Sequence, residues 1–143
     1  MFQHNIYCFL PIFKRNTNGG WGYSLFKSGA SGGRLGTSVS ISGDKAVAGD
    51  PNHSYDASEA YYISQAGAAY IYEMNANGSW QEKQKIVASD RAAADLFGYG
   101  VAISGDYVMV GTPYEDEDAN GNNTLTNPGS AYIFMQSNGI WIQ

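Results

Sequence analysis

The chain repeats itself at a constant offset of 62 residues, and this repeat limits its fold more than any other feature. Residues 67–72 align with residues 129–134, and residues 12–21 resemble residues 71–80, so a third, partial copy lies near the start. Residues 34–51 align with residues 96–113 through eight identical pairs among 18 positions: Gly36/Gly98, Val39/Val101, Ile41/Ile103, Ser42/Ser104, Gly43/Gly105, Asp44/Asp106, Gly49/Gly111 and Pro51/Pro113. A fixed period of this kind is typical of proteins built from one repeated supersecondary unit.

The repeat divides the chain into about two and a half units. We expect residues 1–33 to be the tail of a preceding unit and residues 34–95 to be a complete unit. Residues 96–143 then form most of a further, truncated unit. Both ends of the chain fall inside units under this division.

Each unit carries the pattern of four short strands. Residues 38–42 and 100–104 are rich in β-forming residues, and a Gly-Asp turn joins each to a second strand, at 45–49 and 107–111. The third strands are expected at 67–74 and 129–136, and an Asn-Gly turn leads from the first of these into a fourth strand at 79–87. The second and third strands are nearly continuous apolar runs, which predicts that both faces of each sheet are covered. Residues 89–98 are expected to form one or two helical turns between units.

Tandem four-stranded units that are covered on both faces indicate an all-β protein made of antiparallel β-propeller blades. The spacing of 62 residues exceeds the usual propeller repeat of about 40–50 residues, and one long loop at residues 112–128 accounts for the difference. The alternative is a single β-sandwich with a chance internal similarity, which the identities at one shared offset disfavour.

Charge and cysteine content exclude several classes of function. The net charge is −5 and the 8 Lys and Arg residues are scattered, so no nucleic-acid partner is expected. The single cysteine, Cys8, forms no intrachain disulfide and no cysteine zinc site. The apolar stretch from Tyr7 to Phe13 is too short to span a membrane and is a poor signal peptide. If the protein is exported, its signal lies outside these 143 residues.

Several motifs in the units resemble the FG-GAP repeat of integrin alpha-chain propellers and of many bacterial surface proteins. Phe97-Gly98 opens one strand and Gly111-Thr112-Pro113 closes the next, while the earlier copy has the looser Leu35-Gly36 and Gly49-Asp50-Pro51. The Gly-x-Ala-Tyr-Ile tails and the stretch at residues 85–90 are most similar to the bacterial branch. The resemblance covers residues 12–143, and it implies propeller blades of a secreted or cell-surface protein used for adhesion or as a scaffold.

The long loop of the last unit is similar to the calcium loop that some integrin blades carry. That loop has the form Asp-x-Asp-x-Asp-Gly-x-x-Asp, and here Asp116, Asp118 and Asn120 stand at its first, third and fifth positions, followed by Gly121. Calcium prefers oxygen ligands, and Asn122 offers a seventh-position carbonyl. Thr124 stands where the family places a carboxylate, so we expect low affinity, with Glu115 or Glu117 as additional ligands if they bend inward. A solvated polar turn is the alternative.

The corresponding loop of the earlier unit lacks these ligands. Ser54, Asp56 and Ser58 replace them, Glu59 replaces the glycine, and no metal is expected there. No catalytic residues are expected either. Residues 29–33 match Gly-x-Ser-x-Gly, but they lie in a Gly-Ser loop, and nothing ties the only histidines, His4 and His53, to Ser31.

These observations together predict a non-enzymatic binding or adhesion module, extracellular or at the cell surface. Its partners would be a protein or glycan ligand and the remaining blades of a longer protein. A carbohydrate-binding propeller and a non-catalytic appendage of a secreted hydrolase are the alternatives. The recurring tryptophans Trp21, Trp80 and Trp141 favour packing between blades over ligand stacking. Since so few units cannot close a ring, the end sheets are expected to expose apolar faces, and the isolated chain to be marginally stable or to self-associate.

Overall fold

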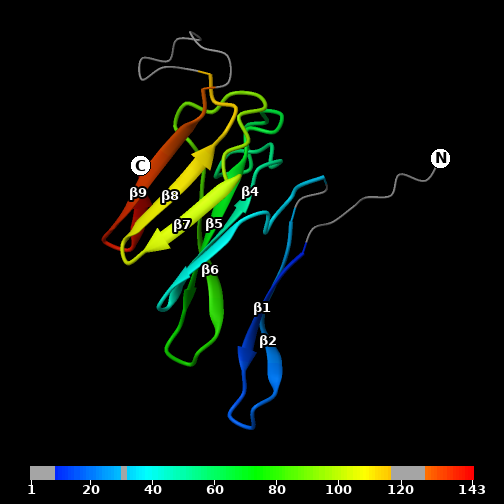
Figure 1. Ribbon diagram of the computed structural model, residues 1–143, viewed down its shortest axis with the longest axis vertical. Coiled ribbons are helices and arrows are strands. Elements are labelled where there is room, and N and C mark those ends of the chain that lie inside the picture. Colours follow the sequence, from blue (N-terminus) through cyan, green and yellow to red (C-terminus); the bar gives the residue numbers. More distant parts are fainter. Residues whose placement is uncertain (1–8, 30–31, 117–127) are drawn as a thin grey trace, which may run out of the picture.

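The computed structural model describes residues 9–29, 32–116 and 128–143. In these residues the chain is all-β, with strands and turns and no helix. Figure 1 shows the strands colour-coded along the chain. They are β1 (Phe9–Arg15), β2 (Trp21–Ser28), β3 (Val39–Ser42), β4 (Lys45–Asp50), β5 (Ala68–Met74), β6 (Trp80–Ile86), β7 (Gly100–Ser104), β8 (Tyr107–Thr112), β9 (Ser130–Ser137) and β10 (Ile140–Ile142).

The strands form three antiparallel sheets that follow chain order. β1 pairs with β2, β3 to β6 form one four-stranded meander, and β7 to β10 form a second one. The predicted hairpins at 38–49 and 100–111 are therefore confirmed as equivalent parts of two successive sheets. Each hairpin turns at a glycine with positive φ, Gly43 or Gly105, which is why that position suits glycine. The sheets in the described residues form no closed ring, and the unit boundaries at residues 34 and 96 stay a prediction.

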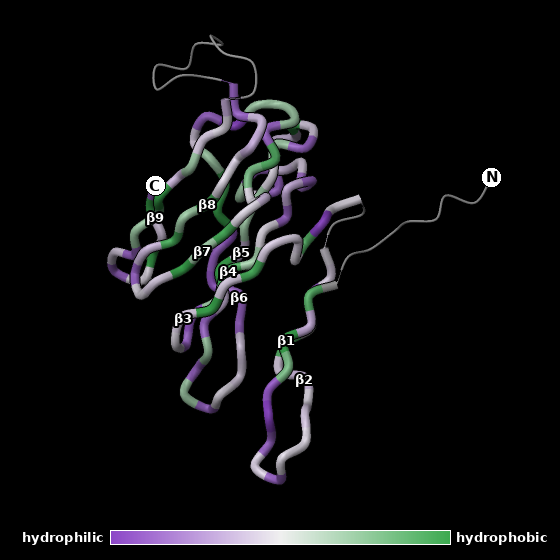
Figure 2. Tube along the Cα trace, in the orientation of Figure 1, coloured by the Kyte–Doolittle hydropathy of each residue, from purple (hydrophilic) through white to green (hydrophobic). Residues whose placement is uncertain are grey.

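The main core lies between the two four-stranded sheets. Figure 2 shows hydrophobic colouring along β4, β7 and β8 and hydrophilic colouring at many of the turns. The first sheet contributes Val47, Ala69, Ile71 and Ile86, and the second contributes Val108, Val110, Phe134 and Trp141. The opposite face of the first sheet packs against Leu10, Ile12 and Leu25 of the β1–β2 hairpin, and an ion pair of 2.7 Å between Lys27 and Glu82 joins β2 to β6.

The prediction that both sheet faces are covered holds for the first sheet only. β4 and β5 are buried along most of their length, because the sheet lies between two neighbours. β8 and β9 instead alternate between buried and exposed residues, so this prediction is wrong for the second sheet, whereas the exposed apolar face expected for an end sheet is found there. The second sheet contacts one neighbour in the described residues, and its outer face remains open to solvent.

A row of serines connects the two sheets at one edge. The Oγ atoms of Ser38, Ser40 and Ser42 accept hydrogen bonds of 3.1, 3.2 and 3.1 Å from the backbone N–H groups of Val101, Ile103 and Gly105. Alternate residues of a strand point to the same side, so the Ser-x-Ser-x-Ser pattern presents three acceptors to β7. Gln84 adds a second link, because its side-chain amide both donates to and accepts from the backbone of Trp141 at 2.8 and 2.9 Å.

The helical turns predicted at residues 89–98 are not present. This segment forms extended backbone and turns, with Ala94 and Leu96 at positive φ. Its N–H groups bond to an earlier loop instead of to themselves, as in Ala94 N to Ser64 O at 3.0 Å and Phe97 N to Ala66 O at 3.1 Å. Tertiary hydrogen bonding therefore outweighs the local helical tendency of the Ala-rich stretch.

The recurring tryptophans behave differently in the three copies. Trp80 and Trp141 are buried between sheets, which confirms the packing role expected for them. Trp21 is 70% exposed. It occupies the same place at the start of a fourth strand, but no further sheet lies against it in the described residues.

Candidate functional site

Two long loops leave equivalent strands at the same end of the two sheets. Residues 51–67 connect β4 to β5, and residues 113–129 connect β8 to β9. Each loop is closed at its base by the same hydrogen bond, Gly67 N to His53 O at 2.8 Å and Gly129 N to Glu115 O at 3.1 Å. The repeat offset thus extends to the loop bases, which makes these loops the natural place to compare functional residues.

The base of the first loop contains a buried pair of polar residues. Asp50 is fully buried and His53 is 2% exposed. One Asp50 oxygen, Oδ1, accepts a hydrogen bond of 2.6 Å from the backbone N–H of Arg34. The other, Oδ2, lies 3.7 Å from His53 Nδ1, and neither of these two atoms has a hydrogen-bond partner.

The base of the second loop has a different buried pair at the same positions. Thr112 and Glu115 are both buried, and the Tyr132 hydroxyl lies 3.0 Å from Glu115 Oε2 and 2.9 Å from Asp90 Oδ1. Burial raises the pKa of Tyr132, and its bonds to the two carboxylates raise it further. Tyr132 therefore stays a neutral donor between two acids.

The first loop folds into a small hairpin above its base. Tyr55 and Tyr62 form an isolated antiparallel bridge, and their rings pack edge to face with centroids 5.3 Å apart. The Asp56 carboxylate organises the turn by accepting hydrogen bonds from Ala60 N at 2.8 Å, Tyr61 N at 3.3 Å and the Ser58 hydroxyl. Desolvation pushes the pKa of Asp56 upward, but these hydrogen bonds and the nearby charge of Arg91 outweigh it and hold the pKa below its usual value.

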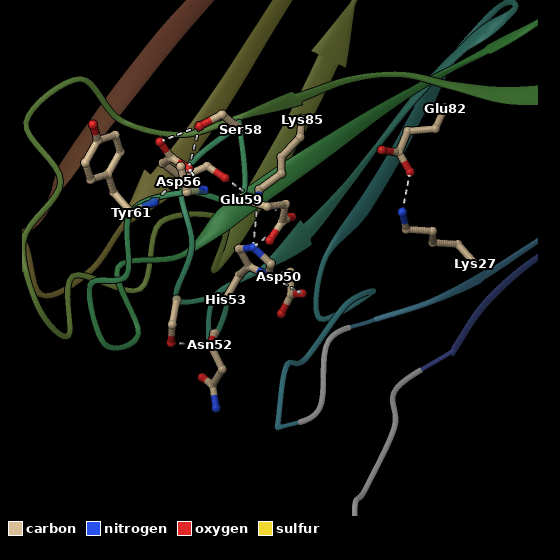
Figure 3. Close-up of polar contacts among 12 residues, drawn as sticks. Lys27, Asp50, Asn52, His53, Asp56, Ser58, Glu59, Tyr61, Glu82 and Lys85 are labelled. Carbon is tan, nitrogen blue, oxygen red and sulfur yellow. Dashed lines mark hydrogen bonds and ion pairs between the residues drawn. The ribbon is translucent and has the colours of Figure 1, made fainter.

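The amine of Lys85 lies beneath this small hairpin. Figure 3 shows it reaching from β6 towards His53 and Glu59. Lys85 Nζ lies 2.5 Å from the backbone oxygen of Asp56, 2.6 Å from Glu59 Oε1 and 2.7 Å from His53 Nε2. The lysine side chain is 6% exposed. A buried ammonium, a buried imidazole and two carboxylates thus meet at the start of the loop.

The predicted calcium ligands are mostly beyond the described residues. Asp118, Asn120, Asn122 and Thr124 lie outside them, and Asp116 is the one predicted ligand that the structure describes. Of the two additional candidates, Glu117 is also outside, while Glu115 is buried beside Tyr132. Within residues 9–29, 32–116 and 128–143, no three His, Cys, Asp or Glu side chains form a metal-binding group.

Sequence reasoning missed the cluster around Lys85. It considered His53 only as a partner for Ser31, which lies outside the described residues. The alignment of His53 with Glu115 in the repeat marks a polar position at each loop base, and this signal was available. Nothing in the sequence connects Lys85 to residues 53–59, because only the pairing of β6 with β5 brings them together.

The segment that joins the two four-stranded sheets, here called the joint, contains the Phe97-Gly98 motif. Phe97 is fully buried between the sheets and forms a parallel bridge with Gly67. The sequence model of the FG-GAP repeat family matches residues 80–134. Residues 80–134 are thus similar to an FG-GAP repeat. The matched stretch begins at β6 in the first sheet and ends in β9 of the second, so the FG-GAP repeat spans the joint.

The motif residues of the FG-GAP repeat therefore have a structural role. Phe97 fills the space between the sheets, and Gly98 has a φ of 92° and packs against the backbone of Ala68 and Asp50. FG-GAP repeats form β-propeller-type modules, and the two sheets agree with that architecture. No curated protein matches the chain. Among the residues that the structure describes, no helix has the length and apolar character needed to cross a lipid bilayer.

Proposed function

We propose that the chain is a non-enzymatic module of a β-propeller that serves in binding or adhesion, outside the cell or on its surface. The observation that carries this proposal is an exposed apolar face on the second sheet. The equivalent face of the first sheet is buried against its neighbour. The extracellular location rests on the place where FG-GAP repeats usually occur, and the FG-GAP match supports a module without catalysis of its own.

The uncovered face belongs to β8 and β9. Met109 and Ile133 are 49% and 56% exposed there. Their counterparts at the repeat offset, Val47 and Ile71, are buried, because the first sheet uses this same face to hold the second. Apolar side chains that are buried at an interface in one repeat and exposed in the next support the docking of a further sheet of the same kind.

A charge on this face should reduce self-association of the isolated chain. Ile133→Lys places an ammonium at the centre of the apolar patch, where a second molecule would have to bury it. We expect the sedimentation coefficient of the wild type to rise with concentration, and that of the variant to rise much less. The stability of the variant should change by no more than about 0.5 kcal/mol, since the site is exposed.

Tyr61→Lys is the matched control, because Tyr61 is 73% exposed but lies in the 51–67 loop. It should associate like the wild type. A wild type that remains monomeric at every concentration would show that this face does not attract a further sheet, and the propeller module would have to be reconsidered.

We also propose that the loop of residues 116–124 binds calcium with modest affinity. Its supports are the alternating oxygen-bearing residues and the closed loop base at Glu115 and Gly129. The ligands would be Asp116, Asp118, Asn120, Asn122 and Thr124.

Calorimetry should detect this calcium site and its loss. The wild type is expected to release or absorb heat on calcium addition, and Asp118→Ala should lower the affinity by at least about tenfold, since one of two anionic ligands is removed. Ser58→Ala, at the equivalent position to Asn120 in the first loop, should bind as the wild type does. An absence of heat with the wild type, or unchanged binding by Asp118→Ala, would remove the site.

A carbohydrate ligand is the second candidate, and its support is the pair of exposed tyrosines on the first loop. Tyr61 and Tyr62 are 73% and 62% exposed on a hairpin that is held by the Asp56 turn. Rigid exposed aromatic rings bind ligands at a low cost in conformational entropy, and they suit a protein surface or a sugar face alike. Screening the whole chain against immobilised glycans distinguishes the two partners.

A further inference from the structure

All three N–H donors of the Lys85 ammonium have partners in one loop. A protonated lysine has three N–H groups and no acceptor. The three nearest acceptors are Asp56 O, Glu59 Oε1 and His53 Nε2, at 2.5, 2.6 and 2.7 Å. All three belong to residues 53–59, so one amine from β6 binds the first arm of the small hairpin and its turn.

This arrangement sets the tautomer of His53. Because the ammonium only donates, His53 Nε2 must accept, and the ring hydrogen therefore lies on Nδ1. Nδ1 faces Asp50 Oδ2 at 3.7 Å inside the protein. The imidazole thus lies between the buried Asp50 carboxylate and the buried Lys85 ammonium. It accepts a hydrogen bond from the ammonium, and its Nδ1–H faces the carboxylate.

The donor set around Lys85 is of the type that surrounds a metal ion. A backbone carbonyl, a carboxylate oxygen and an imidazole nitrogen converge on one point, and each is a common metal ligand in proteins. The Glu59 carboxylate oxygen at that point is negatively charged, and the Asp50 carboxylate lies behind the imidazole, 3.7 Å from His53 Nδ1. A cation is therefore needed there, and the chain provides one.

We propose that residues 53–59 form a cation-holding loop whose resident cation is the ammonium of Lys85. The tethered amine replaces a bound ion, so this loop is ordered without metal. The proposal does not depend on calcium binding by residues 116–124. It explains how the hairpin that carries Tyr61 and Tyr62 stays in place above the sheet while its turn remains largely exposed to solvent.

Removing the amine should open the loop, and a small free amine should close it again. Chymotrypsin cleaves after the exposed tyrosines of this loop, so its rate, followed by mass spectrometry on the whole chain, reports opening. Lys85→Ala leaves buried partners without their cation, and we expect cleavage at least about tenfold faster than in the wild type. Millimolar methylammonium or ethylammonium should slow this cleavage, because each supplies an ammonium of the size that was removed.

Three controls separate this role from general destabilisation or charge screening. Tetramethylammonium at equal ionic strength has no N–H donor and should not slow cleavage. Lys83→Ala removes a nearby lysine that is 50% exposed and pairs with Glu73, and it should be cleaved like the wild type. EDTA should leave wild-type cleavage unchanged, since no metal holds the loop.

A second variant keeps the proposal testable if Lys85→Ala does not fold. Glu59→Gln keeps the shape of an exposed side chain and removes only its charge, so it should increase cleavage by a smaller factor without affecting the fold. Nitrogen chemical shifts of the wild-type His53 ring should show the hydrogen on Nδ1. Unchanged cleavage in both variants, opening of the wild type by EDTA, or equal closing by tetramethylammonium would overturn the proposal.

Discussion

Gly49→Ala is expected to destabilise this chain strongly. Gly49 lies in β4, where the backbone of the FG-GAP joint passes directly over it. An added Cβ atom would overlap the carbonyl oxygen of Gly98, and that oxygen is part of the backbone, so it cannot rotate away. We expect a loss of about 3 kcal/mol or more in the free energy of unfolding, measured by urea denaturation.

Gly111→Ala is the matched control at the same position of the next repeat. A Cβ there would meet the Gly100 oxygen at 3.7 Å, which is ordinary van der Waals contact. Stability should change by no more than about 0.5 kcal/mol. Equal losses at both positions would mean that the strand itself requires glycine, and that the close approach of the next repeat is not the cause.

Phe97→Ala is expected to have the second-largest effect. The Phe97 ring is fully buried, and its centroid lies 5.7 Å from that of Tyr132 and 6.0 Å from that of Phe134. Removing it leaves a cavity between the two sheets, where the surrounding strands cannot collapse without losing their hydrogen bonds. The free energy of unfolding should fall by about 3–5 kcal/mol.

Tyr99→Ala tests whether this loss comes from burial. Tyr99 lies two residues further along the same joint, but its side chain is 51% exposed. Its truncation should change stability by no more than about 0.5 kcal/mol in the same denaturation experiment. A loss for Tyr99→Ala as large as that for Phe97→Ala would assign the effect to the local backbone of the joint.

The strands and hairpins could be predicted because their causes are local. Alternating and continuous β-forming runs, with Gly-Asp turns between them, specify each hairpin through neighbouring residues alone. The repeat supports each hairpin a second time, since Gly43 and Gly105 turn the chain in the same way in both units. For the same reason the FG-GAP motif could be recognised before any contact across it was known.

The failures occur where a distant segment competes with a local preference. Residues 89–98 contain an Ala-rich run that favours a helix, but Ser64, Gln65 and Ala66 accept its backbone hydrogen bonds. Residues 107–111 and 129–136 are as apolar as a strand buried on both faces, but β8 and β9 have one neighbour in the described residues. Local sequence shows what a segment can bury, and only the assembled sheets show what covers it.

The same distinction between local and distant causes applies to the candidate sites. Sequence alone determined the all-β class, the repeat, the hairpins and the loop positions, because spacing and turn chemistry act over a few residues. It also supplied the calcium hypothesis for residues 116–124, which stays a prediction. Tertiary structure alone decided that Lys85 meets His53 and Glu59, because a contact between residues 26 to 32 positions apart depends on strand register. A buried charge is stable only beside its partner, and no pattern in the sequence records that partner.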